Sequence, residues 1–101
     1  MLSEDMAEAA NQECPILDKV YEDQTVVGIS GKKVEFDTVK FVRCRMEECD
    51  FSGASFCNVV FDKCDFSNCS FRDTYWKNEL KDNNVRFKQI QLAGDIDPNK
   101  V

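Results

Sequence analysis

The sequence lacks histidine, has only two prolines and four glycines, and contains no long apolar run. Without histidine, neither Ser-His-Asp nor Cys-His catalysis can be assembled within one chain. A membrane-spanning helix needs about eighteen or more apolar residues, and a secretory signal needs a basic start followed by an apolar stretch. Neither pattern is present. We therefore expect one cytoplasmic domain that is not an enzyme and holds no cofactor or metal.

The sequence instead has a strict spacing of five between large apolar residues. The large column consists of Phe36, Phe41, Met46, Phe51, Phe56, Phe61, Phe66, Phe71 and Trp76. A column of smaller residues precedes it by two positions and consists of Val34, Val39, Cys44, Cys49, Ala54, Val59, Cys64, Cys69 and Thr74. We expect both columns to point inward and to form the core.

A period of five fits neither of the regular single elements. A helix repeats its buried face roughly every 3.6 residues and a flat strand roughly every 2. Steps of five would turn about 140° around a helix and spread the phenylalanines over all its sides. The alternation of large, polar and small residues within each unit is typical of a short extended segment. Short strands joined by regular turns predict an all-β solenoid of stacked coils.

Two segments resemble units of the pentapeptide-repeat family. They run from Cys49 to Phe56, with the sequence CDFSGASF, and from Cys64 to Phe71, with the sequence CDFSNCSF. Units of that family have a small residue, a polar residue, a central Leu or Phe and two polar positions. The resemblance implies a right-handed, four-sided β-helix with four units in each coil, and with the small and central residues inside. We expect about three to four coils over residues 24–94.

Coils of this length would place residues twenty apart above one another, at about the 4.8 Å spacing of neighbouring strands. The expected stacks are Phe36–Phe56–Trp76, Phe41–Phe61, Met46–Phe66 and Phe51–Phe71. Full burial of each ring contributes roughly 1.5–3 kcal/mol. Ring burial, rather than pairing of charges, is therefore expected to stabilise the fold.

Four of the six cysteines lie in the small column, where they are expected to act as small, reduced, buried hydrophobic residues. A zinc site is the alternative, because Cys44–Cys49 and Cys64–Cys69 are spaced alike. Rings would separate the two members of each pair too widely for one tetrahedral ion. Stacked Cys44 and Cys64 would approach disulfide distance, but parallel side chains give poor dihedral angles. Cys57 is expected to point outward as an accessible thiol.

Residues 1–23 hold seven acidic residues and one basic residue. A short helix with Ser3 as its cap, running through Ala9 and stopped before Pro15, is one expectation here. Two interpretations of the whole segment stay open. The first is a frayed acidic tail. The second is a cap that shields apolar rings and strand edges at the end of the coils. The residues available to such a cap are Ile16, Leu17, Val20 and Tyr21.

From residue 24 to residue 31 the spacing persists weakly. Val26 and Gly31 keep the phase of the large column, and Ile29 keeps that of the small column. We interpret this stretch as degenerate first units that lead into Val34.

Beyond Trp76 the spacing is interrupted once. The next central position would be Lys81, but the pattern returns after a shift of one residue. We therefore expect one additional residue within 77–82, as a bulge or a loop between coils. Residues 95–101 are expected to form a C-terminal tail. The last coil would offer a candidate homodimer interface made of Phe87, Ile90 and Leu92.

The charges help to choose between two functions that the family resemblance implies. Quinolone-resistance members of the family bind DNA gyrase and related type II topoisomerases as mimics of duplex DNA. The net charge of −6 favours this activity. However, residues 24–101 hold twelve acidic and twelve basic residues, so the excess lies entirely in residues 1–23. A neutral coil imitates the dense charge of DNA poorly.

We therefore expect a protein-interaction or scaffold module with a protein partner that the sequence does not identify. Direct contact with nucleic acid or a membrane is not expected, and topoisomerase binding is the alternative. Two neighbouring sides of the coil differ in charge. The basic side carries Lys40, Arg43 and Lys63, and the acidic side carries Glu47, Glu48 and Asp65. Such a dipolar surface suits contact with a protein.

Overall fold

The computed structural model describes residues 1–77, 82–83, 86–88 and 91–93, with side chains described for residues 1–77. In that part of the chain one helix precedes a series of short strands. The elements are α1 (Leu2–Gln12), β1 (Ile16–Glu22), β2 (Thr25–Val27), β3 (Glu35–Val42), β4 (Arg45–Glu47), β5 (Ser55–Cys57), β6 (Val60–Asp62), β7 (Asp65–Ser67), β8 (Ser70–Arg72), β9 (Tyr75–Lys77), β10 (Asp82–Asn83), β11 (Arg86–Lys88) and β12 (Gln91–Ala93).

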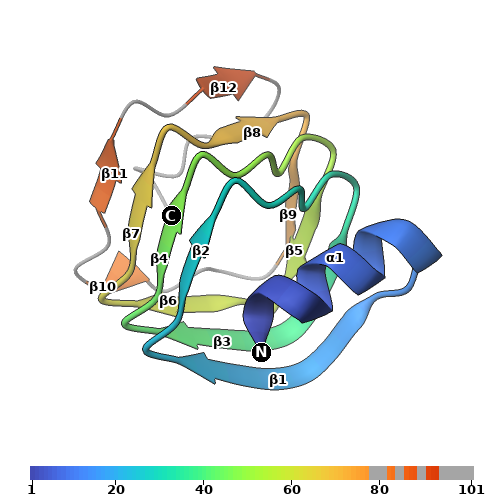
Figure 1. Cartoon of the computed structure of the whole chain (residues 1–101), viewed down its shortest axis with the longest axis horizontal. Helices are drawn as coiled ribbons and strands as arrows, with labels where there is room; N and C mark the ends of the chain where they lie inside the picture. The colour runs from blue at the N-terminus through green and yellow to red at the C-terminus, as the bar shows by residue number, and fades with distance from the viewer. Residues whose placement is uncertain (78–81, 84–85, 89–90, 94–101) are drawn as a thin grey trace.

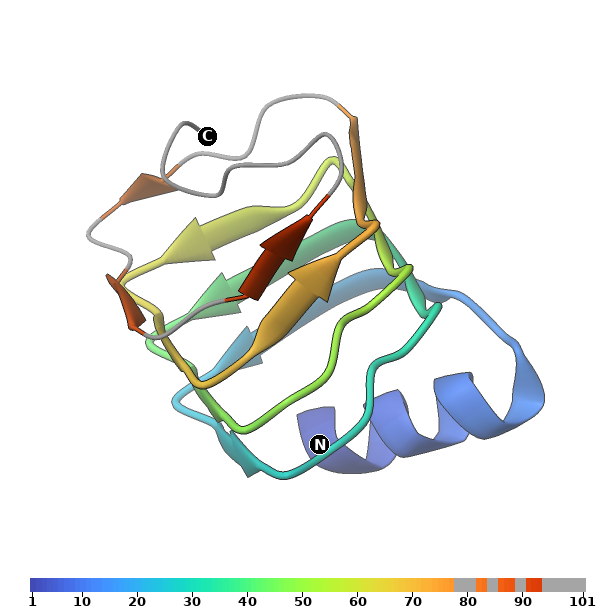
Figure 2. The same ribbon diagram turned by 90° about the horizontal axis from the view of Figure 1, so that it is seen from above.

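The strands stack in parallel, and each pairs with the strand at the equivalent place in a neighbouring coil. Ile16 lies beside Phe36, Phe36 beside Phe56, and Phe56 beside Trp76. Each partner comes twenty residues after the last, so one coil has the predicted length. The chain passes through three such coils between Ile16 and Trp76, and Figure 2 shows them stacked side-on. This confirms the predicted β-solenoid.

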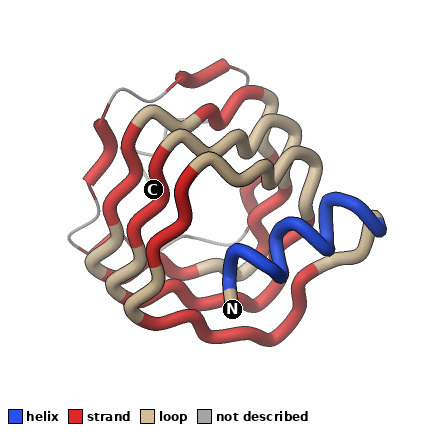
Figure 3. Tube along the Cα trace, in the orientation of Figure 1, coloured by secondary structure: helices blue, strands red, loops and turns tan. Residues whose placement is uncertain are grey.

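The coil has four sides, which are visible when the tube is viewed along its axis in Figure 1. Figure 3 shows strands on three sides, with β1 and β3 each continuing through a corner, and loops along most of the fourth side. We number the sides by their inward central residues. Side 1 has Ile16, Phe36, Phe56 and Trp76, side 2 has Tyr21, Phe41 and Phe61, side 3 has Val26, Met46 and Phe66, and side 4 has Gly31, Phe51 and Phe71.

The interior is filled by the two columns of apolar residues. Every large-column residue from Phe36 to Phe71 has at most 3 % of its surface exposed, and Trp76 packs partly buried against them. Rings on one side lie nearly parallel, as in Phe36–Phe56 with centroids 5.1 Å apart and planes 5° apart. Rings on adjacent sides meet edge to face, as in Phe61–Phe66 at 89°. Both arrangements are favourable for aromatic pairs.

Each corner is turned by a residue with positive φ. These residues recur every fifth position, with φ between 50° and 71°. They are Glu13, Asp18, Asp23, Gly28, Lys33, Thr38, Arg43, Glu48, Gly53, Asn58, Lys63, Asn68 and Asp73. Most are Asp, Asn or Gly, which tolerate this conformation best. Thr38 is β-branched and has φ of 58°, so it carries more strain than its equivalents.

Residues 1–23 form a helix and a strand rather than a frayed tail. Helix α1 lies across the N-terminal end of the tube and buries Leu2, Met6 and Ala9 there. The expected helix limits were wrong. Met1 is the N-cap without a side-chain hydrogen bond, and the helix ends at Glu13, whose φ of 56° turns the chain before Pro15. No helix in the described residues is both long and apolar enough to span a membrane.

Strand β1 belongs to the solenoid itself. Among the residues proposed for a cap, Ile16 and Tyr21 are buried inside the first coil, whereas Leu17 and Val20 face outward and are 50 % and 60 % exposed. The first coil therefore begins at Ile16 rather than in the stretch after Gln24. In that stretch Val26 is buried in the core, and Ile29 packs partly buried against it.

Gly31 makes room for the helix. It occupies the side 4 position that Phe51 and Phe71 fill in later coils. A Cβ atom on Gly31 would lie 2.9 Å from Met6 Cε and 2.9 Å from Phe51 Cδ1, closer than real Cβ atoms approach. Met6 therefore occupies space above Phe51 that a side chain at position 31 would need. The helix can seal the tube because this one unit lacks a side chain.

The pairing changes by one residue at the C-terminal end. Cys57 pairs with Lys77, twenty residues later, whereas Phe61 pairs with Asp82, twenty-one residues later. The longer separation continues in β11 and β12, where Phe66 lies beside Phe87. Ile90 lies outside the described residues, and the side chains of Phe87 and Leu92 are also outside them. The same holds for the expected tail at 95–101.

Replacing Phe56 by alanine should remove the ring that contacts Phe36 and Trp76 on its own side. We expect Phe56→Ala to lower the free energy of unfolding by about 3–5 kcal/mol, because the cavity cannot close in a tube of fixed width. Val60→Ala, on the outside of β6, should cost less than about 1 kcal/mol. Urea denaturation followed by circular dichroism measures both. A Phe56→Ala loss no larger than that of Val60→Ala would contradict the account of the core.

Replacing Thr38 by asparagine should stabilise the protein, since Asn58 follows it in the same corner stack and tolerates positive φ. The expected gain is up to about 1 kcal/mol, the scale of the left-handed penalty. Thr25→Asn is the matched control. It makes the same change in an exposed strand position, where Thr is preferred, and should be neutral or destabilising. Thermal unfolding of both variants measures the change in stability. An equal change in the two variants would contradict the strain assigned to Thr38.

Candidate protein-binding surface

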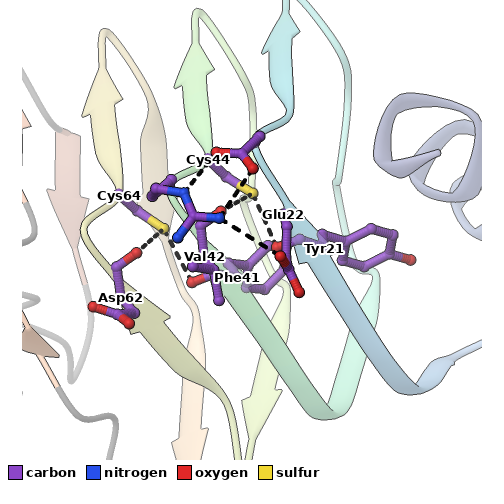
Figure 4. A network of polar contacts seen from close by, with 9 residues as sticks. Tyr21, Glu22, Phe41, Val42, Cys44, Asp62 and Cys64 are labelled. Atoms are coloured by element: carbon purple, nitrogen blue, oxygen red, sulfur yellow. Dashed lines mark hydrogen bonds and ion pairs between the residues drawn. The ribbon is translucent and has the colours of Figure 1, made fainter.

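The buried cysteines are structural rather than reactive. The Cys44 thiol donates to the backbone carbonyls of Tyr21 and Val42, and the Cys64 thiol donates to those of Phe41 and Asp62, as Figure 4 shows. The hydrogen bond between the two thiols raises the pKa of Cys64 and lowers the pKa of Cys44 to about 7. Cys49 and Cys69 repeat this arrangement on the next corner.

The cysteines of the chain are all free thiols, and those four are buried. Among residues 1–77 no group of three or more acidic or cysteine side chains is placed to hold a metal ion. Cys57 is half-buried on the outside of side 1, and Cys14 is exposed after the helix. The interior therefore supplies packing, and recognition must occur on the outer surface.

One outer network joins the first two coils on side 2. The Arg43 guanidinium donates to both carboxylate oxygens of Asp23, at 2.6 and 3.0 Å, and lies 3.5 Å from Glu22. The hydrogen bond from Arg43 lowers the pKa of Asp23, and the same bond raises the pKa of Arg43. Asp23 and Arg43 are twenty residues apart and therefore neighbours in one corner stack.

This network changes the expected dipolar surface. Arg43 was assigned to a basic side, but Glu22 and Asp23 neutralise it. On side 3, Asp65 was assigned to an acidic side, but Arg45 lies 3.9 Å from it. Glu48 is exposed and Glu47 is half-buried beside it. Opposite charges are thus interspersed along both sides, so neither side presents a field of one sign.

The N-terminal end differs because it has a groove with two acidic residues, Asp5 and Glu8, in its walls. The groove lies between α1 and β1 and has a volume of about 310 Å³. Helix residues Asp5, Glu8, Ala9 and Gln12 form one wall, and the other wall is formed by Cys14, Pro15, Ile16, Leu17, Lys19 and Tyr21. Those four helix positions share one face, since they follow the three-and-four spacing of a helix.

Tyr21 and Asp5 fix the helix against the strand. The Tyr21 hydroxyl donates to Asp5 Oδ2 at 2.7 Å. Burial raises the pKa of Tyr21, and the neighbouring Asp5 carboxylate raises it further. A second tie joins the start of the helix to the coil, where the Leu2 N–H donates to Gln24 Oε1 at 2.6 Å. The groove is therefore held open by hydrogen bonds at two places along α1.

The sequence interpretation missed this groove although part of the signal was present. Ile16, Tyr21, Val26 and Gly31 continue the spacing of five back from Phe36. The acidic composition of residues 1–23 led instead to the interpretation as a tail or a cap, and Lys19 does not fit the small position of a repeat unit. Tyr75 is 58 % exposed on side 1. No neighbouring exposed aromatic among residues 1–77 accompanies it.

The fold and the repeat together define the class of protein as a pentapeptide β-solenoid. Residues 36–74 match the family model named pentapeptide repeats, in eight copies. Residues 36–74 are therefore a run of pentapeptide repeats. A comparison with curated proteins found no match. The matched residues cover coils two and three, whereas the helix and the first coil lie before them.

Acid should remove the contribution of the Asp23–Arg43 pair. Because the folded-state pKa of Asp23 is lowered, the pair stabilises the protein above the unfolded pKa near about 3.9, and this contribution is lost as pH falls through the folded pKa. The difference in stability between the wild type and Asp23→Asn should therefore shrink below about pH 4. Urea denaturation of both proteins at a series of pH values measures this difference in the free energy of unfolding. A difference that is constant with pH, or unaffected by about 1 M salt, would contradict the pairing.

Proposed function

We propose that this protein is a non-enzymatic interaction module, and that its acidic N-terminal end is the surface that recognises a protein partner. The observation that carries the proposal is the groove between α1 and β1, which Asp5 and Glu8 line at the end of the chain that holds the excess of acidic residues. The coil behind it acts as a rigid support, because its interior is occupied by packed rings. A preorganised surface loses little conformational entropy on binding.

Three features support an interaction role over catalysis. The chain has no histidine. The buried thiols within the described coils donate to backbone carbonyls and have no base beside them. The family also consists in general of structural repeat proteins that bind other proteins. The proposal therefore assigns no catalytic residue.

DNA mimicry is the second candidate, and the net charge of −6 is what favours it. A mimic needs acidic residues spread along the rod at the spacing of phosphates. In this chain the ion pairs of Arg43 and Arg45 neutralise acidic residues on sides 2 and 3. Residues 24–77 hold eight acidic and eight basic residues, so the excess is confined to one end. Binding of a basic protein surface fits this distribution better.

The test compares two triple variants that remove the same charge from different places. Glu4→Gln, Glu8→Gln and Glu13→Gln neutralise the N-terminal end, and Glu35→Gln, Glu48→Gln and Asp73→Asn neutralise exposed sites on the coils. The full chain is immobilised and partners are captured from a lysate of the organism that encodes it. We expect capture to fall at least about fivefold in the first variant and less than about twofold in the second.

Equal capture by both triple variants would overturn the assignment of the N-terminal end. A DNA gyrase supercoiling assay with added protein separates the second candidate. An interaction module with another partner should leave supercoiling unchanged. Inhibition of supercoiling, or protection of the enzyme from a quinolone, would instead establish the DNA-mimic function.

A further inference from the structure

Strand β1 leaves one of its edges open. β1 pairs with β3 along one edge, and no described strand pairs with the other. In the next coil, the carbonyls of Val42 and Glu47 accept hydrogen bonds from the N–H groups of Asp23 and Gly28, at 2.9 and 2.8 Å. Val42 and Glu47 each follow a central residue, and their carbonyls point to the preceding coil.

Leu17 occupies the same place in the first coil, directly after Ile16. No coil precedes it, so the Leu17 carbonyl faces the open end of the tube. In an extended strand the N–H and the carbonyl of one residue point to the same side. Leu17 therefore presents both a donor and an acceptor at the outer edge of β1. Unpaired edges of this kind accept another strand readily.

The open edge and the groove coincide. Leu17 lines the groove and is 50 % exposed, so its side chain offers apolar contact beside the free backbone groups. The opposite wall is the face of α1 that carries Asp5, Glu8 and Gln12. An extended chain lying in the groove would therefore meet hydrogen-bonding backbone on one side and carboxylates on the other.

We propose that the open edge of β1 binds an extended basic peptide segment of a partner protein as an added β-strand, with Lys or Arg side chains directed at Asp5 and Glu8. Charge complementarity selects this occupant. The groove walls carry two acidic residues, Asp5 and Glu8, and one basic residue, Lys19, within a segment of net negative charge, so a cationic segment is attracted. The same charge repels a second copy of this end and repels nucleic acid. Backbone pairing supplies affinity and the side chains supply specificity.

This inference rests on the proposed function and names the chemistry of the partner. The probe is a random octapeptide library displayed on phage and selected against the full-length protein. We expect enriched sequences to contain at least two Lys or Arg residues and no acidic residue. A synthetic copy of the strongest sequence is then measured by fluorescence polarisation. Its affinity should fall steeply with salt, because the attraction is between exposed charges.

N-methylation of the peptide tests for backbone pairing. Methyl groups on alternate amides remove every donor that faces one side of an extended strand. One of the two alternating sets should reduce affinity about tenfold or more, and the other less than about threefold. Equal effects of the two sets would exclude an added strand.

Two variants of Leu17 test the edge on the protein side. Leu17→Pro removes the outward N–H, and proline is common directly before the positive-φ residue of a turn, here Asp18. Leu17→Val keeps the N–H and an apolar side chain. We expect about tenfold weaker binding for Leu17→Pro and less than about threefold for Leu17→Val. Thermal unfolding verifies that both variants fold. If Leu17→Pro does not fold, two other measurements test the added strand. Glu8→Lys should weaken peptide binding about tenfold, and the N-methylated peptides test the backbone pairing.

The outcomes separate this inference from the proposed function. No enriched peptide, or binding that Leu17→Pro and N-methylation leave unchanged, would overturn the added strand, while capture that depends on the acidic residues would still stand. Loss of that capture would overturn the proposed function as well. A peptide-independent dimer that Leu17→Pro dissolves would identify a second copy as the occupant and would also overturn the inference.

Discussion

The fold depends on the stacking of rings at a fixed repeat of twenty residues. Each ring contacts the equivalent ring of the neighbouring coil and the edges of rings on adjacent sides, as Phe56 does with Phe36, Phe61 and Trp76. The parallel backbone pairing requires the same repeat, so packing and hydrogen bonding reinforce one register. A slip of one residue would turn the buried side chains outward. The acidic end, the groove and the open strand edge are all positioned by this register.

The spacing of five made the solenoid predictable because burial and turn geometry recur in the same unit. Phe51 and Cys49 alone indicate little, but nine units in phase exclude a helix and a flat sheet. The sequence was less informative where residue type and spacing disagree. Tyr21 keeps the phase, yet Lys19 two positions before it is exposed and looks unlike a repeat residue. Positive φ at Thr38 also could not be expected from its identity, since the neighbouring coils impose it.

The binding surface was harder to predict than the fold because it depends on contacts between distant residues. The Asp23–Arg43 pair follows from the register, once twenty residues per coil is known. The groove does not, since it requires α1 to lie across the tube. Two small details permit this, the glycine at position 31 and the hydrogen bond from Tyr21 to Asp5. Neither is apparent from composition, and the acidic residues alone are equally typical of an unfolded segment.

The seal made by α1 has a consequence for self-assembly. A bare solenoid has two equivalent faces on which further coils can grow, and copies could add head to tail without limit. Here Leu2 and Met6 cover the rings at one end, so a second copy cannot continue the stack there. Any association of coil ends must use the opposite terminus of both molecules and close on itself after two. One helix of 11 residues thus prevents head-to-tail stacking of coils at this end.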